Sequence, residues 1–182
     1  NIKNLKNLSR KEKISETIKA LNNGYELIYG GWLQSGKWSG EIDFLEINTK
    51  KKSNLGSWSY EVIDTKYSSR VKSDHIYQVS LYSFLINEAQ GFLPENFYIL
   101  LKDKSKEAIK LKDVYETFLV HKTSYETFIE SELNGLNTKK NNYFSFCDLK
   151  AACENEIVHD KHLSHVLGTN KKNIKKLNNA KI

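Results

Sequence analysis

A short apolar run of the sequence ends in an acid and a base two residues apart. The stretch YEVIDTK spans residues 60–66, and Asp64 and Lys66 follow Val62 at the spacing of a strand. Side chains two residues apart in a strand lie on one face, so the carboxylate and the ammonium would point the same way. A buried charge is costly unless it is paired or binds a metal. On an exposed strand the same pair would be a solvated ion pair of little energetic value.

A second acid, Asp43, stands between apolar residues in the preceding strand-like run. If the two runs pair as neighbouring strands, Asp43 and Asp64 lie near the same edge of the sheet. Two carboxylates bind a hard cation such as Mg²⁺, with water, phosphate oxygens and a backbone carbonyl such as that of Thr65 completing the shell. Lys66 would orient a water or stabilise charge on a phosphate. Glu61 is left out, because strand alternation places it on the opposite face from Asp64. The alternative for Asp43 alone is an acid that caps a turn.

The helix that follows carries polar side chains at helical spacing. His75, Gln78 and Tyr82 occupy positions i, i+3 and i+7 of KSDHIYQVSLYSFLINEA, which places them on one face. Such a stripe, facing the acids, would support the metal-binding strand and contact a nucleic-acid strand. The alternative is an ordinary helix that exposes its glutamine and half-buries its tyrosine.

The elements that must position these residues alternate between strand and helix. A first helix over residues 9–22 has an apolar face of Ile14, Ile18 and Leu21. Strands are predicted at 25–33, 38–47, 58–67, 96–101 and 108–111, and further helices at 72–89 and 113–133. This order predicts an α/β fold with a mixed central sheet flanked by helices, and a small helical C-terminal tail. We expect a core of residues 1–142 and a cysteine-containing helical segment of residues 143–182.

The composition suits a folded globular protein. Hydrophobic residues make up 39% of 182 residues, and no run approaches the 18 apolar residues of a membrane span. The first residues given, NIKNLKNLSRKEK, lack the apolar run of a secretory signal, and the sequence has only two cysteines. We therefore expect a reducing, cytoplasmic location and no membrane partner. The net charge of +6 suits nucleic acid, or reflects codon composition alone. Because the sequence contains no methionine, we expect a fragment of a longer polypeptide with other domains and an incomplete N-terminal part of the core.

Three motifs in order resemble a known family. They are GxxDF at residues 40–44, YEVxDTK at 60–66 and QxxxY at 78–82. Together they resemble the RecB-like branch of the PD-(D/E)XK nuclease superfamily, and most closely the RecB-family nucleases that carry a helical DNA-binding element after the nuclease module. The likeness covers most of residues 14–168. The DxK motif alone is weak, but the three motifs at this spacing are fairly specific.

The resemblance implies a restriction-endonuclease-like fold and hydrolysis of DNA that depends on Mg²⁺ or Mn²⁺. The residues that it places in the site are Asp43, Asp64, Lys66, Gln78 and Tyr82. The two aspartates would bind metal, the lysine would be catalytic, and the helical pair would support the site and touch DNA. The family also has an acid or a histidine on the helix before the sheet, and only Glu16 is placed for that role here. We retain His75 as a further candidate.

The tail contains the two cysteines of the chain, Cys147 and Cys153. Relatives show a longer cysteine pattern that ligates an iron–sulfur cluster, but two cysteines cannot supply four thiolates, so no cluster is expected within this chain. Cys153 with His159 and His162 has an irregular spacing for zinc, and two buried free thiols are the interpretation we favour.

The last segment, HLSHVLGTNKKNIKKLNNAKI, resembles the first half of a helix-hairpin-helix. Its turn at residues 168–170 would offer backbone amides to a phosphate. The basic residues expected to bind the nucleic-acid backbone are Arg70, Lys72, Lys171, Lys172, Lys175 and Lys176. The alternative is a solvated basic tail.

The sequence therefore predicts a metal-dependent nuclease that acts on DNA, with RNA as the alternative polymer. Its first rival is a catalytically inactive nucleic-acid-binding module of the same fold, which the missing upstream motif favours. The second rival is a structural interaction protein that is basic only through codon composition.

Overall fold

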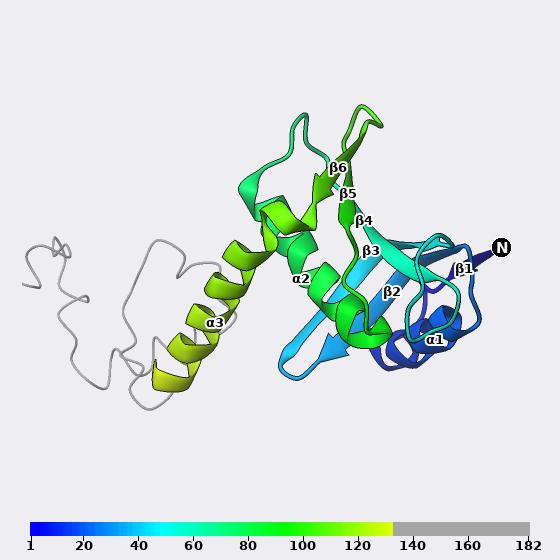
Figure 1. The fold of residues 1–182 in the computed structure, drawn as a ribbon, viewed down its shortest axis with the longest axis horizontal. Helices are drawn as coiled ribbons and strands as arrows, with labels where there is room; N and C mark the ends of the chain where they lie inside the picture. The colour runs from blue at the N-terminus through cyan, green and yellow to red at the C-terminus, as the bar shows by residue number, and fades with distance from the viewer. Residues whose placement is uncertain (133–182) are drawn as a thin grey trace, which may run out of the picture. The chain divides into compact units, whose positions relative to one another are not determined.

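A six-stranded mixed sheet with strand order β1-β2-β3-β4-β5-β6 organises the first part of the chain (Figure 1). The structure, a computed structural model, describes residues 1–132. Residues Asn1–Tyr125 form one unit, and a second unit begins at Glu126. The elements are β1 (Ile2–Asn4), α1 (Arg10–Asn22), β2 (Leu27–Ser35), β3 (Trp38–Asn48), β4 (Ser59–Thr65), α2 (Ser73–Gln90), β5 (Asn96–Leu100), β6 (Lys106–Lys110), the short 3-10 helix η1 (Leu111–Asp113) and α3 (Tyr115–Glu132).

Strand pairing confirms the predicted class and adds one strand. β2, β3 and β4 form an antiparallel meander, and β5 pairs antiparallel with β6. β4 and β5 are parallel, and α2 is the helical crossover that such neighbours need. β1, which the sequence analysis did not predict, pairs parallel with β2. The chain is therefore α/β with an open mixed sheet, and the predicted strands and helices are found within a few residues of their expected bounds.

Local signals explain where the elements begin and end. Ser9 caps α1 in a capping box with Glu12, whose carboxylate accepts the Ser9 backbone N–H at 2.9 Å. Gly36, with φ of +56°, makes the tight turn between β2 and β3. Gly91 ends α2 in the left-handed conformation, and its N–H donates to Asn87 O at 2.7 Å.

The buried face of α1 differs from the predicted one. The structure buries Lys13, Thr17, Ala20 and Leu21. Ile18, which we placed in the apolar face, is 41% exposed. Thr17 takes a core position because its hydroxyl accepts the Trp32 backbone N–H at 2.9 Å, and because Gly31 leaves room for it. Of the predicted Ile14–Ile18–Leu21 face, Leu21 is buried, Ile14 is partly buried, and the placement of Ile18 was wrong.

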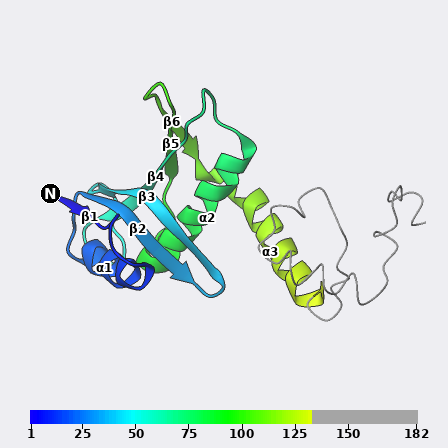
Figure 2. The same cartoon turned by 180° about the vertical axis from the view of Figure 1, so that it is seen from behind.

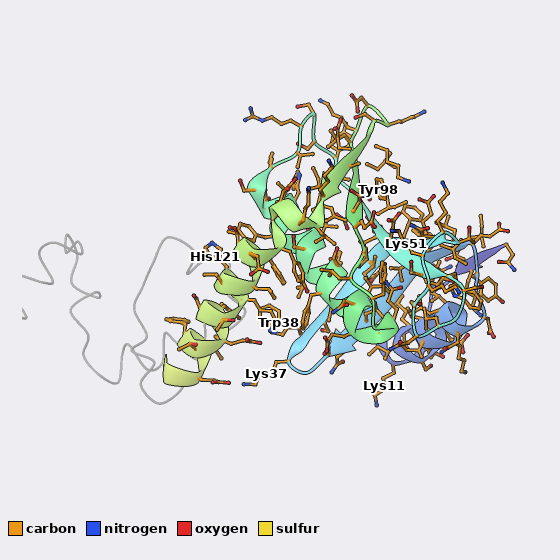
Figure 3. All side chains as sticks on the ribbon, in the orientation of Figure 1. Lys11, Lys37, Trp38, Lys51, Tyr98 and His121 are labelled. Atoms are coloured by element: carbon orange, nitrogen blue, oxygen red, sulfur yellow. The ribbon has the colours of Figure 1, made fainter. Side chains whose placement is uncertain are left out.

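Side chains from α1, α2 and the strands form one contiguous core, and β4 runs through it. Tyr60, Val62 and Asp64 are buried at alternating positions of β4. Glu61 instead accepts a hydrogen bond from the hydroxyl of Tyr98 on β5 at 3.2 Å (Figure 3 labels Tyr98). This confirms that Glu61 and Asp64 lie on opposite faces. Of the helices in residues 1–132, none is long and apolar enough to cross a membrane.

Candidate functional site

The register of β3 and β4 brings the two predicted aspartates together. Phe44 pairs with Ile63, so Asp43 and Asp64 occupy the next opposed position along the two strands. Opposed residues in antiparallel strands have neighbouring side chains. Burial raises the pKa of Asp64, and the negative charge of Asp43 acts in the same direction.

Thr65 holds the carboxylate of Asp43. Oδ2 of Asp43 accepts the backbone N–H of Thr65 at 2.8 Å and its hydroxyl at 2.5 Å. The sequence analysis considered only the Thr65 carbonyl, as a metal ligand. The contact that the structure shows is made by the amide and hydroxyl, which fix the orientation of Asp43 next to the end of β4.

Asp64 is a buried carboxylate with one cationic partner. The residue is 3% exposed, and Oδ2 lies 2.6 Å from Nζ of Lys66. The same oxygen is buried and accepts no hydrogen bond of good geometry. Burial raises the pKa of Asp64 above its ordinary value, and the ammonium of Lys66 opposes that shift. The Asp64–Lys66 pair is therefore not the solvated surface pair that was its alternative interpretation.

Lys66 connects the strands to α2 through a chain of hydrogen bonds. Its Nζ donates to Oε1 of Gln78 at 2.6 Å, and Nε2 of Gln78 donates to the hydroxyl of Tyr82 at 2.7 Å. Burial raises the pKa of Tyr82, and the nearby carboxylates act in the same direction. Gly40 makes this arrangement possible, because a Cβ there would lie 2.5 Å from Cε1 of the Tyr82 ring. The three predicted motifs thus converge on one place.

Glu41 is a third acid near the site that the sequence analysis missed. Its charge, like those of the two aspartates, acts on Tyr82. Oε1 of Glu41 lies 2.8 Å from Nζ of Lys6 and 2.9 Å from Nζ of Lys13, whose side chain is only 7% exposed. Burial alone would raise the pKa of Glu41, but the two ammonium groups outweigh it and hold that pKa below its ordinary value. The spacing of Glu41 and Asp43, two residues apart in a strand, was a signal that could have found it.

Two further candidates have different surroundings. His75 is buried in the first turn of α2, where Nδ1 accepts the Lys72 backbone N–H at 3.3 Å. Glu16 pairs with Lys3 of β1 at 3.0 Å and with Lys19 of α1 at 2.8 Å. Its ion pairs are therefore made away from Asp43 and Asp64. The position on α1 that faces the site carries a base, Lys13.

Several predictions concern residues after 132 and lie outside the described part of the chain. They are the roles of Lys171, Lys172, Lys175 and Lys176, the cysteine and histidine interpretations, and the boundary at residue 142.

The site has the donors of a two-carboxylate cation site. Within residues 1–132, no group of three or more His, Cys, Asp or Glu side chains is arranged to hold a metal. Mg²⁺ needs only one or two carboxylates, since water and substrate phosphate complete its shell. The buried carboxylate of Asp64 lies beside that of Asp43, and a cation, the ammonium of Lys66, already lies 2.6 Å from its Oδ2. A metal ion bound there would replace that ammonium. Asp43, Asp64 and the carbonyl of Thr65 would hold the metal ion.

Compared with models of known protein families, the chain matches none, and no curated protein matches its sequence. The family resemblance therefore stays a prediction, and the function must be argued from the site itself.

Proposed function

We propose that this chain is a metal-dependent nuclease that hydrolyses DNA phosphodiester bonds, with a RecB-like active site on a restriction-endonuclease-like core. The observation that carries the proposal is the buried Asp64, which lies opposite Asp43 and 2.6 Å from the ammonium of Lys66. A buried carboxylate beside a second one costs stability unless a cation or a partner compensates it. Carboxylates with raised pKa values beside a specific charged partner cluster at functional sites.

Each side chain has a distinct task in this proposal. A bound Mg²⁺ or Mn²⁺ would polarise the phosphate and lower the pKa of a nearby water. Asp43, oriented by Thr65, and Asp64 would bind that cation. Lys66 would exchange its contact with Asp64 for the phosphate oxygen on which charge develops. Gln78 and Tyr82 keep the ammonium in place through their hydrogen bonds.

The test compares two substitutions on opposite faces of β4. Purified Asp64→Asn should lose cleavage of a labelled DNA oligonucleotide by at least about 100-fold, since removal of one group that stabilises the transition state costs that much. Glu61→Gln, three residues away and bonded to Tyr98, should cleave like the wild type. EDTA should stop DNA cleavage by the wild type and by Glu61→Gln, and added Mg²⁺ should restore it. Cleavage by Asp64→Asn at the wild-type rate, or cleavage that EDTA leaves unchanged, would reject the proposal.

One observation favours the rival, a nucleic-acid-binding module without catalysis. Lys66 already neutralises Asp64, and α1 presents Lys13 rather than an acid to Glu41. If the rival is correct, the wild type binds DNA and fails to cleave it with Mg²⁺ or Mn²⁺, and Asp64→Asn binds as tightly as the wild type. An RNA oligonucleotide in the same assay distinguishes the two polymers.

A further inference from the structure

Two loops project from the end of the sheet where β4 ends and Lys66 follows. Residues 66–72 join β4 to α2, and residues 101–105 join β5 to β6; both views show the two loops next to each other (Figures 1 and 2). The Lys102 backbone N–H donates to Ser68 O at 3.1 Å, so the loops are joined directly. We call residues 66–72 and 101–105 the loop pair.

The loop pair carries an aromatic ring with no packing of its own. Tyr67 is 99% exposed, although it directly follows Lys66, whose side chain is only 18% exposed. A buried tyrosine packs its ring against protein and usually gives its hydroxyl a hydrogen-bond partner. Tyr60 and Tyr82 are buried in this way, and each hydroxyl has a protein partner. Tyr67 instead offers both faces of its ring beside the proposed catalytic lysine.

The charge of the loop pair is almost entirely positive. Its basic residues are Lys66, Arg70, Lys72, Lys102 and Lys104. Its one acid, Asp103, accepts hydrogen bonds from the N–H and hydroxyl of Ser105 at 3.1 and 2.7 Å, and these hold its pKa below the ordinary value. That carboxylate is therefore committed to the shape of the turn. The remaining charge suits a polyanion.

We propose that the loop pair binds an unpaired nucleic-acid strand, with Tyr67 stacked on a base and the basic side chains along the phosphates. Exposed aromatic rings within a basic groove bind single strands because every base has a face to stack on. A base inside a duplex offers no such face, because its neighbours in the stack cover both of its faces. This proposal rests on the proposed function, because a nuclease would bring a nucleic-acid strand to Lys66. Its tests measure binding and not cleavage, so either proposal can fail without the other. DNA and RNA share this chemistry, so the test includes both.

The first test measures binding without cleavage. The full chain in EDTA is titrated into labelled oligo(dT), oligo(rU) and a blunt DNA duplex, and binding is followed by fluorescence anisotropy. Tyr67→Ala should bind one or both single strands at least about five-fold more weakly, the lower bound for loss of one stacked base. Tyr67→Phe should bind like the wild type, and the duplex affinity should not change. Because the side chain is exposed, neither variant should alter the urea midpoint.

The second test measures how much the basic side chains of the loop pair contribute to single-strand binding, through its dependence on salt. Lys102→Ala combined with Lys104→Ala should reduce the slope of log K against log salt by about 1.4, at about 0.7 for each phosphate contact of a single strand. Lys11→Ala combined with Lys51→Ala is the matched control of equal charge, because both side chains lie away from the loop pair (Figure 3). The control should leave the slope unchanged.

The outcomes separate this proposal from the nuclease. Wild-type affinity of Tyr67→Ala for both single strands, an equal loss on duplex, or an unchanged salt slope in the lysine variant would overturn the proposal, even where Mg²⁺-dependent cleavage persists. Tyr67-dependent binding in a chain that never cleaves would support the proposal and reject the nuclease. A loss confined to oligo(rU) or to oligo(dT) supports the proposal and identifies the polymer.

Discussion

A single methyl group at Gly40 should disturb both the stability of the fold and the candidate site. The added Cβ would lie 2.5 Å from Cε1 and 3.1 Å from Cδ1 of the Tyr82 ring, whereas ordinary contact begins at 3.4 Å. The ring must therefore move by about 0.9 Å, the difference between 3.4 and 2.5 Å. Tyr82 is 7% exposed and lies within the core cluster, so its ring has no free space to enter.

Two measurable effects follow from that displacement. Overpacking of a core typically costs about 1–3 kcal/mol, so Gly40→Ala should lower the free energy of unfolding in urea by about 2 kcal/mol. The moved hydroxyl also loses its 2.7 Å contact with Gln78, which orients Lys66. A displacement of about 1 Å at a reacting group costs on the order of 100-fold in rate, and we expect that loss in the cleavage assay.

A double-mutant cycle isolates the clash. Tyr82→Leu removes the ring carbons that the methyl group meets, so Gly40→Ala should cost less than about 0.5 kcal/mol in that background. The coupling between the two substitutions should then account for most of the loss in the single variant. Equal costs of Gly40→Ala in both backgrounds, or wild-type stability of Gly40→Ala, would refute the reasoning.

Three other substitutions test buried polar contacts by urea unfolding. Gln90→Leu removes the side chain that bonds both the N–H and the carbonyl of Tyr60, at 2.7 and 3.2 Å, and should cost at least about 2 kcal/mol; an unchanged midpoint would contradict this. Thr17→Val leaves a backbone N–H without its acceptor and should cost about 1–3 kcal/mol, whereas a stabilised variant would show that the hydroxyl is dispensable. Glu41 has a lowered pKa, so its contribution is present above 4.5 and is lost as the pH falls below that value. The stability advantage of the wild type over Glu41→Gln should therefore be larger at pH 7 than at pH 3, and an advantage independent of pH would contradict this account.

The positions of most strands were predictable because their signals are local. The turn at Gly36 and the alternation along YEVIDTK depend on neighbouring residues only, and they placed Glu61 and Asp64 on opposite faces as the structure has them. A tight turn joins β2 to β3, whereas residues 49–58 join β3 to β4, so the sequence analysis could only assume the pairing of β3 with β4 that the structure shows. Asp43 and Asp64 became neighbours as a direct consequence of that pairing.

The residues that the sequence analysis missed depend on partners distant in the chain. The predicted apolar face of the first helix did not include Lys13 and Thr17. Both are buried, and they contact Glu41 and the Trp32 N–H, respectively. Hydropathy ranks side chains by transfer from water and does not include the partner that makes burial of a polar group tolerable. For the same reason Ile18 was placed in the core, although the structure leaves it 41% exposed.

The most direct test of the central claim is anomalous diffraction from crystals soaked in Mn²⁺, collected for the wild type and for Asp64→Asn. The account predicts a manganese peak within coordinating distance of the carboxylates of Asp43 and Asp64 in the wild type, with Lys66 turned away from Asp64, and no peak in the variant. A wild-type map without that peak, in which the ammonium of Lys66 still lies against Oδ2 of Asp64, would contradict it.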